Sequence, residues 1–157
     1  MTDTRATRFL GDAGAWFQVH IYELADEVEG TYGESVARAL GVEPDRLFKT
    51  LIATVDSDAV VAIVPVSARL STKNLARAAG GKRADMTPPD QAERLTGYVT
   101  GGISPFGQRR ALPFYVDETI ELFETVFVSA GQRGVQLELA PETLVALLDA
   151  TIADLTA

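Results

Sequence analysis

Two apolar runs rich in valine and isoleucine, residues 47–55 and 60–66, are separated only by the polar segment Asp56-Ser57-Asp58. Runs of this length and composition are typical of β-strands, and a short polar interruption between them is typical of a hairpin turn. A hairpin with this much apolar surface has to be buried against other elements, so we expect a fold built on a β-sheet.

The rest of the chain alternates between strand and helix patterns, without an internal repeat or a linker. Strand patterns occupy residues 15–22, 98–99, 112–116, 126–129 and 135–139. Because several neighbouring strands are joined by short turns, the sheet is predicted to be mixed rather than purely parallel. Helices are expected at residues 4–12, 32–40, 72–79 and 87–95, and from Pro141 onward with a buried stripe of Leu144, Leu147, Leu148, Ile152 and Leu155.

Length and composition narrow the class of protein. With 157 residues, 46% of them apolar, the chain is predicted to form a single domain over residues 1–157. It has no cysteine and one histidine, which excludes disulfides, a cysteine nucleophile and metal sites built on thiolates or several histidines. We therefore expect neither a metal nor another cofactor.

Charge and hydropathy indicate where the chain acts and what it binds. No signal peptide and no stretch long enough to span a bilayer is recognised, so we expect a soluble cytoplasmic protein without a membrane partner. The formal net charge of −8 argues against strong nonspecific binding to nucleic acid, because such binding depends on many cationic contacts with phosphates.

A glycine-rich segment at residues 96–110 is the first candidate for a functional loop. Gly101 and Gly102 stand together, and Ser104, Pro105 and Gly107 follow within five residues. Glycine allows the backbone to approach a ligand closely, so the N–H groups of this segment are candidates to face a carbonyl or carboxylate. Taken alone, the segment favours the simpler interpretation, a plain tight turn, because glycine and proline occur in many turns.

Lys49 is the second candidate, because it interrupts the otherwise apolar run Leu47-Phe48-Lys49-Thr50-Leu51. Lysine is rarely buried without a partner. Its side chain must therefore either reach a polar cleft or lie at an exposed edge of the sheet, and composition alone does not separate these two.

Five further segments follow one another in a fixed order along the chain. They are Phe48-Lys49-Thr50-Leu51, Ile63-Val64-Pro65-Val66, Leu70-Ser71-Thr72-Lys73, Gly97-Tyr98 leading into Gly101-Gly102-Ile103-Ser104-Pro105-Phe106-Gly107, and Val128-Ser129-Ala130-Gly131-Gln132-Arg133-Gly134. Together these segments resemble the YbaK/EbsC family of aminoacyl-tRNA deacylases over nearly the whole chain. The resemblance implies an α/β (mixed α+β) single domain, with a curved mixed sheet partly closed into a barrel and helices around it.

The resemblance also implies a function, the removal of cysteine from mischarged Cys-tRNA(Pro) in trans, alongside prolyl-tRNA synthetase. It implies that the thiol of the substrate attacks its own ester carbonyl while Lys49 and the Gly101-Gly102 loop position the ester at the 3′ end of the tRNA. Gln136 stands where the family has an aspartate, which bears on how the α-ammonium group of the substrate is held. The implied substrate-binding residues are Tyr22, Thr50, Ser129 and Gln136.

Two other functions remain open at this point. One is a deacylase for another small amino acid such as alanine or serine, which would need an activated water because these substrates have no thiol. The other is a non-catalytic module that uses the cleft for a small ligand or a partner protein, an interpretation that Gln136 supports. The oligomeric state is not indicated by the sequence.

Overall fold

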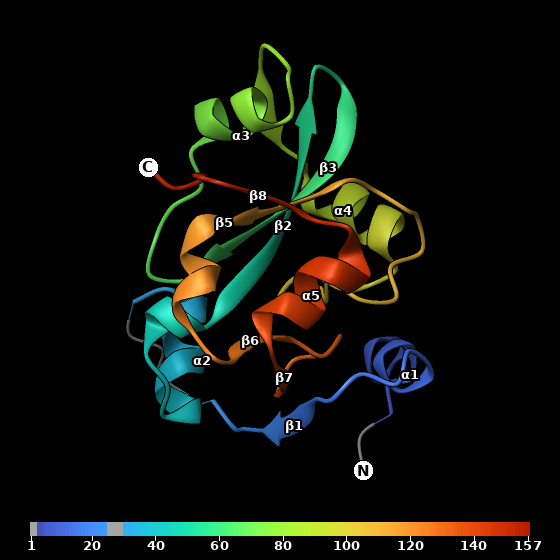
Figure 1. The fold of residues 1–157 in the computed structure, drawn as a ribbon, viewed down its shortest axis with the longest axis vertical. Coiled ribbons are helices and arrows are strands. Elements are labelled where there is room, and N and C mark those ends of the chain that lie inside the picture. The colour runs from blue at the N-terminus through green and yellow to red at the C-terminus, as the bar shows by residue number, and fades with distance from the viewer. Residues whose placement is uncertain (1–2, 25–29) are drawn as a thin grey trace.

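The computed structural model describes residues 3–24 and 30–157. In these residues, five α-helices, two short 3₁₀ helices and eight strands are arranged in two sheets (Figure 1). The helices are α1 (Arg5–Asp12), α2 (Tyr32–Leu40), α3 (Thr72–Ala78), α4 (Pro89–Thr96) and α5 (Pro141–Leu148), with 3₁₀ helices η1 (Pro44–Arg46) and η2 (Glu118–Leu122). The strands are β1 (Gln18–Ile21), β2 (Phe48–Val55), β3 (Asp58–Pro65), β4 (Ala84–Met86), β5 (Phe114–Asp117), β6 (Val126–Ser129), β7 (Val135–Leu139) and β8 (Thr151–Ala153).

The predicted hairpin is confirmed as the antiparallel pair β2–β3, in which Val55 lies opposite Asp58. The two turn residues, Asp56 and Ser57, both have positive φ, at 49° and 77°. A two-residue turn of this kind twists in the sense that the flanking strands require, and Asp is among the residues that tolerate it. Asp56 is held there because its carboxylate accepts the N–H groups of Lys82 and Arg83.

A five-stranded sheet with the order β4-β2-β3-β5-β8 contains this hairpin. Strand β5 runs parallel to β3 and to β8, while β2 is antiparallel to both β3 and β4, so the predicted mixed sheet is confirmed. One face of this sheet packs against α3 and the C-terminal segment through an apolar cluster that includes Val55, Val64, Leu75 and Leu155.

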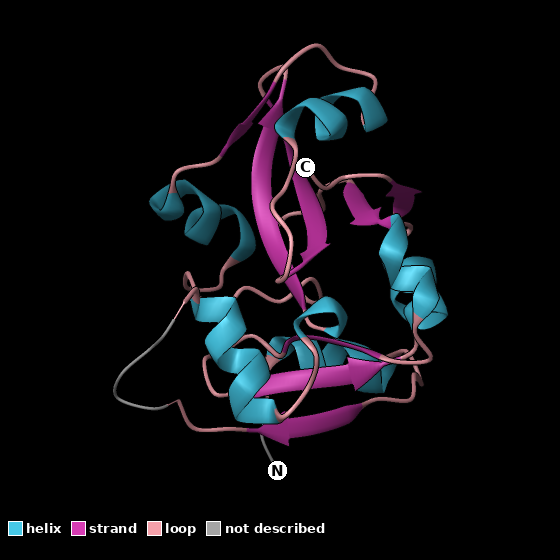
Figure 2. Cartoon of the chain, turned by 90° about the vertical axis from the view of Figure 1, so that its left-hand side faces the viewer, coloured by secondary structure: helices cyan, strands magenta, loops and turns pink. Residues whose placement is uncertain are grey.

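The second sheet is three-stranded, with the order β1-β7-β6, and its strands run in a clearly different direction (Figure 2). The main core lies between the two sheets and also takes in α1, α4 and α5. Its members include Leu10, Phe48, Ile52, Phe106, Val128, Leu137 and Leu144.

The expected partial barrel is wrong, because no sheet closes on itself in the described part of the chain. The sheets meet through one isolated bridge, Leu47 with Phe127. On the side away from β3, β2 pairs only at residues 53–55, with β4. Between these points the edge of β2 has no neighbouring strand among the described residues, and residues of β6, β7 and the glycine-rich segment face it across a cavity.

Three other expectations differ from the structure. Residues 98–99 form part of a loop rather than a strand, and the strand expected at residues 15–22 is confined to β1. The last helix ends at Leu148, because Asp149 adopts a left-handed conformation that reverses the chain into β8. The Asp117 carboxylate then accepts the Leu155 N–H at 2.9 Å, which holds the C-terminal segment against the sheet.

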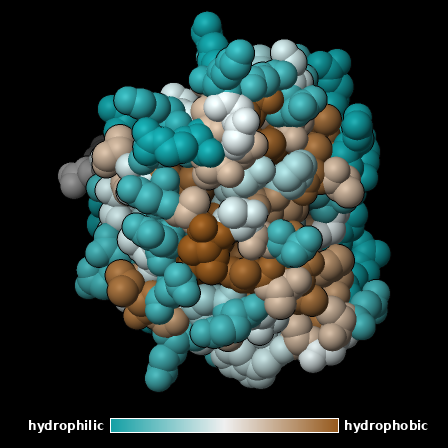
Figure 3. All heavy atoms as spheres, turned by 45° about the horizontal axis from the view of Figure 1, so that its top comes forward, coloured by the Kyte–Doolittle hydropathy of each residue, from teal (hydrophilic) through white to brown (hydrophobic). Residues whose placement is uncertain are grey.

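On the molecular face shown in Figure 3, hydrophobic side chains gather in the middle and hydrophilic ones surround them. The large apolar side chains that remain exposed include Trp16, Ile21 and Leu122. In the described ranges, no helix has the length and apolar character needed to cross a membrane.

Candidate functional site

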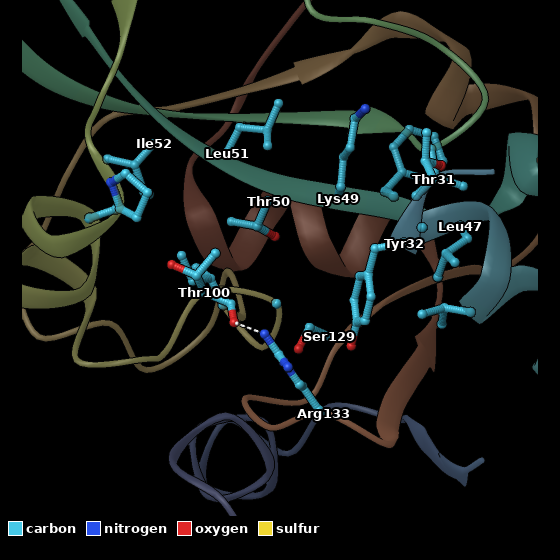
Figure 4. A pocket seen from close by; sticks show the side chains of 18 of the residues that line it. Thr31, Tyr32, Leu47, Lys49, Thr50, Leu51, Ile52, Thr100, Ser129 and Arg133 are labelled. Atoms are coloured by element: carbon cyan, nitrogen blue, oxygen red, sulfur yellow. Dashed lines mark hydrogen bonds between the residues drawn. The ribbon is translucent and has the colours of Figure 1, made fainter. Parts of the chain in front are cut away.

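A cavity of about 590 Å³ lies beside the open edge of β2. Its walls come from β2, the start of α2, residues 86–92, the glycine-rich segment, and the facing ends of β6 and β7 (Figure 4). Five of the seven residues proposed from the sequence line it. They are Lys49, Thr50, Gly101, Ser129 and Gln136.

The pairing of β2 explains why its edge faces the cavity. The Leu47 carbonyl accepts the Val66 N–H on the β3 side, whereas the Ile52 carbonyl accepts the Thr87 N–H on the other side. Because backbone groups alternate in direction along a strand, the N–H and C=O of Thr50 also point away from β3. The cavity is therefore bordered by the edge of β2, where the N–H and C=O of Thr50 have no backbone partner in the described part of the chain.

Lys49 and Thr50 leave β2 on opposite faces of the strand. Lys49 is half-buried on the cavity wall, which resolves the choice left open by composition in favour of a cleft. Burial lowers the pKa of its ammonium, the nearby Arg69 lowers it further, and Glu34 partly opposes both effects. Within the described ranges, no carboxylate lies within ion-pairing distance of it.

Five buried side-chain polar atoms lack a hydrogen-bond partner in the described part of the chain, and three of them belong to residues that line the cavity. These three are Thr50 Oγ1, Thr87 Oγ1 and Gln136 Oε1. An unpaired buried polar atom costs about 1–3 kcal/mol. Their presence around one cavity makes this wall a candidate site for polar groups of a ligand.

The glycine-rich segment makes a tight turn, as the simpler interpretation predicts, and this turn also borders the cavity. Gly101 has φ +89°, and a Cβ placed there would lie 2.7 Å from Nε of Arg133. Arg133 in turn donates to the Thr100 carbonyl at 3.0 Å (dashed in Figure 4). The Gly102 N–H donates to the Val99 carbonyl at 2.9 Å, and Gly102 does not line the cavity. The turn itself uses the N–H of Gly102. Of the two amide groups expected to face the ligand, the Gly101 N–H therefore remains as a candidate donor.

The glycine-rich loop is held by contacts with α1 and by a hydrogen bond within the loop. Arg5 in α1 donates to the Thr96 carbonyl at 3.1 Å, and its guanidinium lies over the Tyr98 ring. The Tyr98 hydroxyl donates to the carbonyl of Phe106, which closes the loop on itself. The backbone that presents Gly101 is therefore fixed by contacts with the N-terminal helix.

Tyr22, which was expected in the pocket, is not among the described residues that line it. Tyr22 is buried, and its hydroxyl has no hydrogen-bond partner in the described ranges. It lies near Tyr32, which does line the cavity. Burial, and then the proximity of Tyr22, raise the pKa of Tyr32 to about 12.

Tyr32 and Arg133 were missed as site residues by the sequence analysis. Tyr32 was recognised only as the start of a helix, and Arg133 only as part of a resembling segment. The Arg133 guanidinium lies 5.6 Å from the centroid of the Tyr32 ring. Nothing in the sequence indicated this contact, because the two residues are far apart in the chain. No group of acidic or histidine side chains suited to a metal ion occurs in the part that the structure describes.

Known proteins resemble this chain in sequence and in fold. Residues 27–147 match the model of the aminoacyl-tRNA editing domain family. The chain is 40% identical over 136 residues to "Putative Cys-tRNA(Pro)/Cys-tRNA(Cys) deacylase EbsC" from Enterococcus faecalis, covering 86% of this chain and 83% of that protein. It is 29% identical over 132 residues to "Multifunctional Ser/Thr-tRNA deacylase ProXp-y" from Escherichia coli, covering 83% and 78%.

A solved structure extends the likeness to the whole fold. It is titled "Crystal structure of a putative trans-editing enzyme for prolyl tRNA synthetase" and superposes with a TM-score of 0.84 at 25% identity. The match covers 100% of this chain and 99% of that one.

Proposed function

Because this chain belongs to the aminoacyl-tRNA editing domain family, we propose that it is a trans-editing deacylase that removes cysteine from mischarged Cys-tRNA(Pro). The observation that carries the proposal is the gathering of Lys49, Gly101 and the unpaired oxygens of Thr50 and Gln136 around one cavity. Cysteine and proline differ little in volume, and a binding pocket discriminates poorly between such side chains. A second site that hydrolyses the wrong ester is the physical remedy.

The proposed chemistry uses the substrate thiol as nucleophile. Its sulfur forms a bond to the ester carbonyl carbon, the bond between that carbon and the ribose oxygen breaks, and the ribose oxygen receives the thiol proton. The Gly101 N–H is suited to stabilise the developing oxyanion, a role in which loss of one donor typically lowers the rate by about 10²–10³. Lys49 holds the 3′ end of the tRNA or the ester by charge and hydrogen bonding.

The remaining cavity residues hold the aminoacyl group. The Thr50 hydroxyl and the Gln136 amide oxygen accept hydrogen bonds from the α-ammonium group, and Ser129 borders the same space. Gln136 supplies a neutral acceptor where the resembling family has an aspartate, so this contact is weaker than a charge-assisted one.

Prolyl-tRNA synthetase is the proposed partner. A protein with a net charge of −8 gains little from nonspecific phosphate contacts, so recruitment of the tRNA through a synthetase suits its electrostatics. The likeness to a structure titled as a trans-editing enzyme for that synthetase supports this choice.

A deacylation assay tests the proposal. Cys-tRNA(Pro), Ala-tRNA(Pro), Ser-tRNA and S-methylcysteinyl-tRNA(Pro) are each incubated with the protein, with and without prolyl-tRNA synthetase. We expect turnover of Cys-tRNA(Pro) and none of the S-methyl substrate, which lacks a free thiol. Lys49→Ala should abolish turnover. Lys73→Ala is the control and should retain turnover, because Lys73 is exposed on α3.

A second candidate is a deacylase for serine, threonine or alanine esters. The unpaired oxygens of Thr50, Thr87 and Gln136 favour it, because they would also accept a hydrogen bond from a side-chain hydroxyl. The 29% identity to a multifunctional Ser/Thr-tRNA deacylase points the same way. Faster turnover of Ser-tRNA than of Cys-tRNA(Pro) would select this candidate, and no turnover of any ester would select a binding module.

A further inference from the structure

The cavity is larger than an aminoacyl group needs. At about 590 Å³ it falls within the range of sites that enclose a drug-sized ligand, and a three-carbon amino acid fills only a small part of such a space. Lys49, Thr50 and Gln136 account for one part of its wall. The part bordered by Tyr32 and Arg133 has no role in the chemistry described above.

Tyr32 is a rigidly placed, accessible aromatic ring. It is the first residue of α2, and the preceding Thr31 forms a reciprocal capping box with Glu34 that fixes this end of the helix. The residue remains 37% exposed although it lines the cavity. A tyrosine hydroxyl is uncharged at physiological pH, so the ring does not repel a phosphate.

Arg133 accompanies this ring and is itself fixed. Its guanidinium lies 5.6 Å from the Tyr32 ring centroid and donates to the Thr100 carbonyl at 3.0 Å. In Figure 4 the Tyr32 ring points toward Ser129 and Arg133, while the Lys49 side chain leaves β2 in the direction away from the ring. Lys49 and Arg133 are the charged side chains among the described lining residues, and both are cationic.

An exposed aromatic ring with cations beside it is the arrangement by which proteins hold unpaired nucleotides, since the base stacks on the ring and the backbone meets the cations. We propose that Tyr32, with Arg133 beside it, is the stacking platform for the 3′-terminal adenine of the aminoacyl-tRNA. The inference rests on the proposed function, because the tRNA substrate supplies the base. The proposed stacking contact places the terminal nucleoside beside Tyr32 and the amino acid beside Thr50.

Fluorescence of a base analogue tests this contact directly. The probe is an acceptor-stem microhelix with 2-aminopurine as its 3′-terminal base and cysteine attached through a non-hydrolysable amide. Stacking on an aromatic ring quenches 2-aminopurine, so wild-type protein and Tyr32→Phe should quench it. Tyr32→Ala should abolish the quenching and weaken binding roughly 5- to 100-fold. Trp16→Ala, which removes an aromatic ring 60% exposed outside the cavity, should behave as wild type.

A base-free substrate separates this role from a general loss of structure. Tyr32→Ala should raise KM for Cys-tRNA(Pro) but leave kcat/KM for cysteine ethyl ester, which has no nucleoside, unchanged. Equal losses on both substrates, or quenching that persists in Tyr32→Ala, would overturn the proposal. If wild-type protein hydrolyses Cys-tRNA(Pro) without quenching the probe, the platform fails and the proposed function stands. If it quenches the probe through Tyr32 but hydrolyses no ester, the proposed function fails and the platform stands.

Discussion

The Arg5 guanidinium lies 4.7 Å from the centroid of the Tyr98 ring, so a residue of the N-terminal helix is packed against the glycine-rich loop. Arg5 precedes residue 27, where the match to the editing-domain family begins. The loop closes tightly around it, because a Cβ at Gly97 would lie 2.3 Å from the Arg5 Nη2 atom. The backbone that presents Gly101 to the cavity therefore depends on a helix outside the matched region.

Arg5→Ala is accordingly expected to lower kcat for deacylation about 10- to 100-fold with little change in KM, because a small displacement of Gly101 misplaces its N–H. Steady-state kinetics on Cys-tRNA(Pro) measures this. Arg8→Ala is the matched control, since Arg8 lies on the same helix and pairs with Asp3 at the surface. The expectation fails if both variants retain wild-type kcat.

The elements that were predicted from the sequence are those with local signals. The hairpin required only two apolar runs and a turn at Asp56 and Ser57 that tolerates positive φ. Helix α2 required Gly41, which ends it in the left-handed conformation as expected. Each of these signals acts within a few residues, so no knowledge of the tertiary structure was needed.

The parts that were not predicted depend on contacts between distant segments. The separation of the two sheets depends on how β6 and β7 meet the edge of β2, and the end of α5 depends on the attachment of Leu155 to Asp117. In the site, Lys49 and Gly101 were candidates from their local sequence, and resemblance to a family supplied their expected roles. The pairing of Tyr32 with Arg133 was missed because it exists only after folding.

Gly101→Ala tests the close approach of the loop to Arg133. Alanine at φ +89° is strained by about 1–3 kcal/mol, and its Cβ would meet Arg133 at 2.7 Å. We expect the variant to unfold at a lower urea concentration and to lose deacylation. Gly80→Ala is the matched control, because Gly80 also has positive φ, +73°, but has open space around its Cβ position.

The double variant Gly101→Ala/Arg133→Ala separates the two causes of the expected loss of stability, which are backbone strain at residue 101 and the steric contact with Arg133. Removing the Arg133 side chain relieves the steric contact but not the backbone strain, so stability should recover in part, to about that of Gly80→Ala. Equal stability of the single variants Gly101→Ala and Gly80→Ala would show that the Arg133 contact has no steric consequence.

Lys49 is expected to reduce stability while it serves the reaction. Burial and Arg69 lower the pKa of its ammonium, so the folded state disfavours the charged form relative to the unfolded state. This loss of stability is fully present at pH values below the pKa of Lys49 in the folded state. It is relieved as the pH rises from that value toward 10.5, the usual pKa of lysine, because Lys49 then loses its proton in the folded state before it does so in the unfolded state.

Lys49→Met keeps the apolar stem and removes the charge, so it should raise the free energy of unfolding at pH 7 while abolishing deacylation. Urea titrations at pH 7 and pH 10 should show a smaller gain at pH 10. Lys73→Met is the control, since Lys73 is exposed on α3 and should show no gain. A less stable Lys49→Met would mean that the ammonium has a stabilising partner.

Glu138 joins β7 to the segment before β2. Its carboxylate is 2.8 Å from His20 Nε2 and 3.2 Å from Arg46 Nη2, and it accepts the Thr125 hydroxyl at 2.6 Å. Burial by itself raises the pKa of this carboxyl group. The hydrogen bonds from Thr125 and His20 and the charges of His20 and Arg46 outweigh burial, so the pKa is lowered below its usual 4.5.

A carboxyl group whose folded pKa is lowered contributes stability above its unfolded pKa and loses it as pH falls through the folded value. Glu138→Gln should therefore be less stable than wild type by about 1.5–3 kcal/mol at pH 7, and this difference should shrink below pH 4. Urea titrations between pH 7 and pH 3 measure it, with the exposed Glu142→Gln as control. A difference that stays constant over this pH range would show that Glu138 acts through packing rather than through its charge.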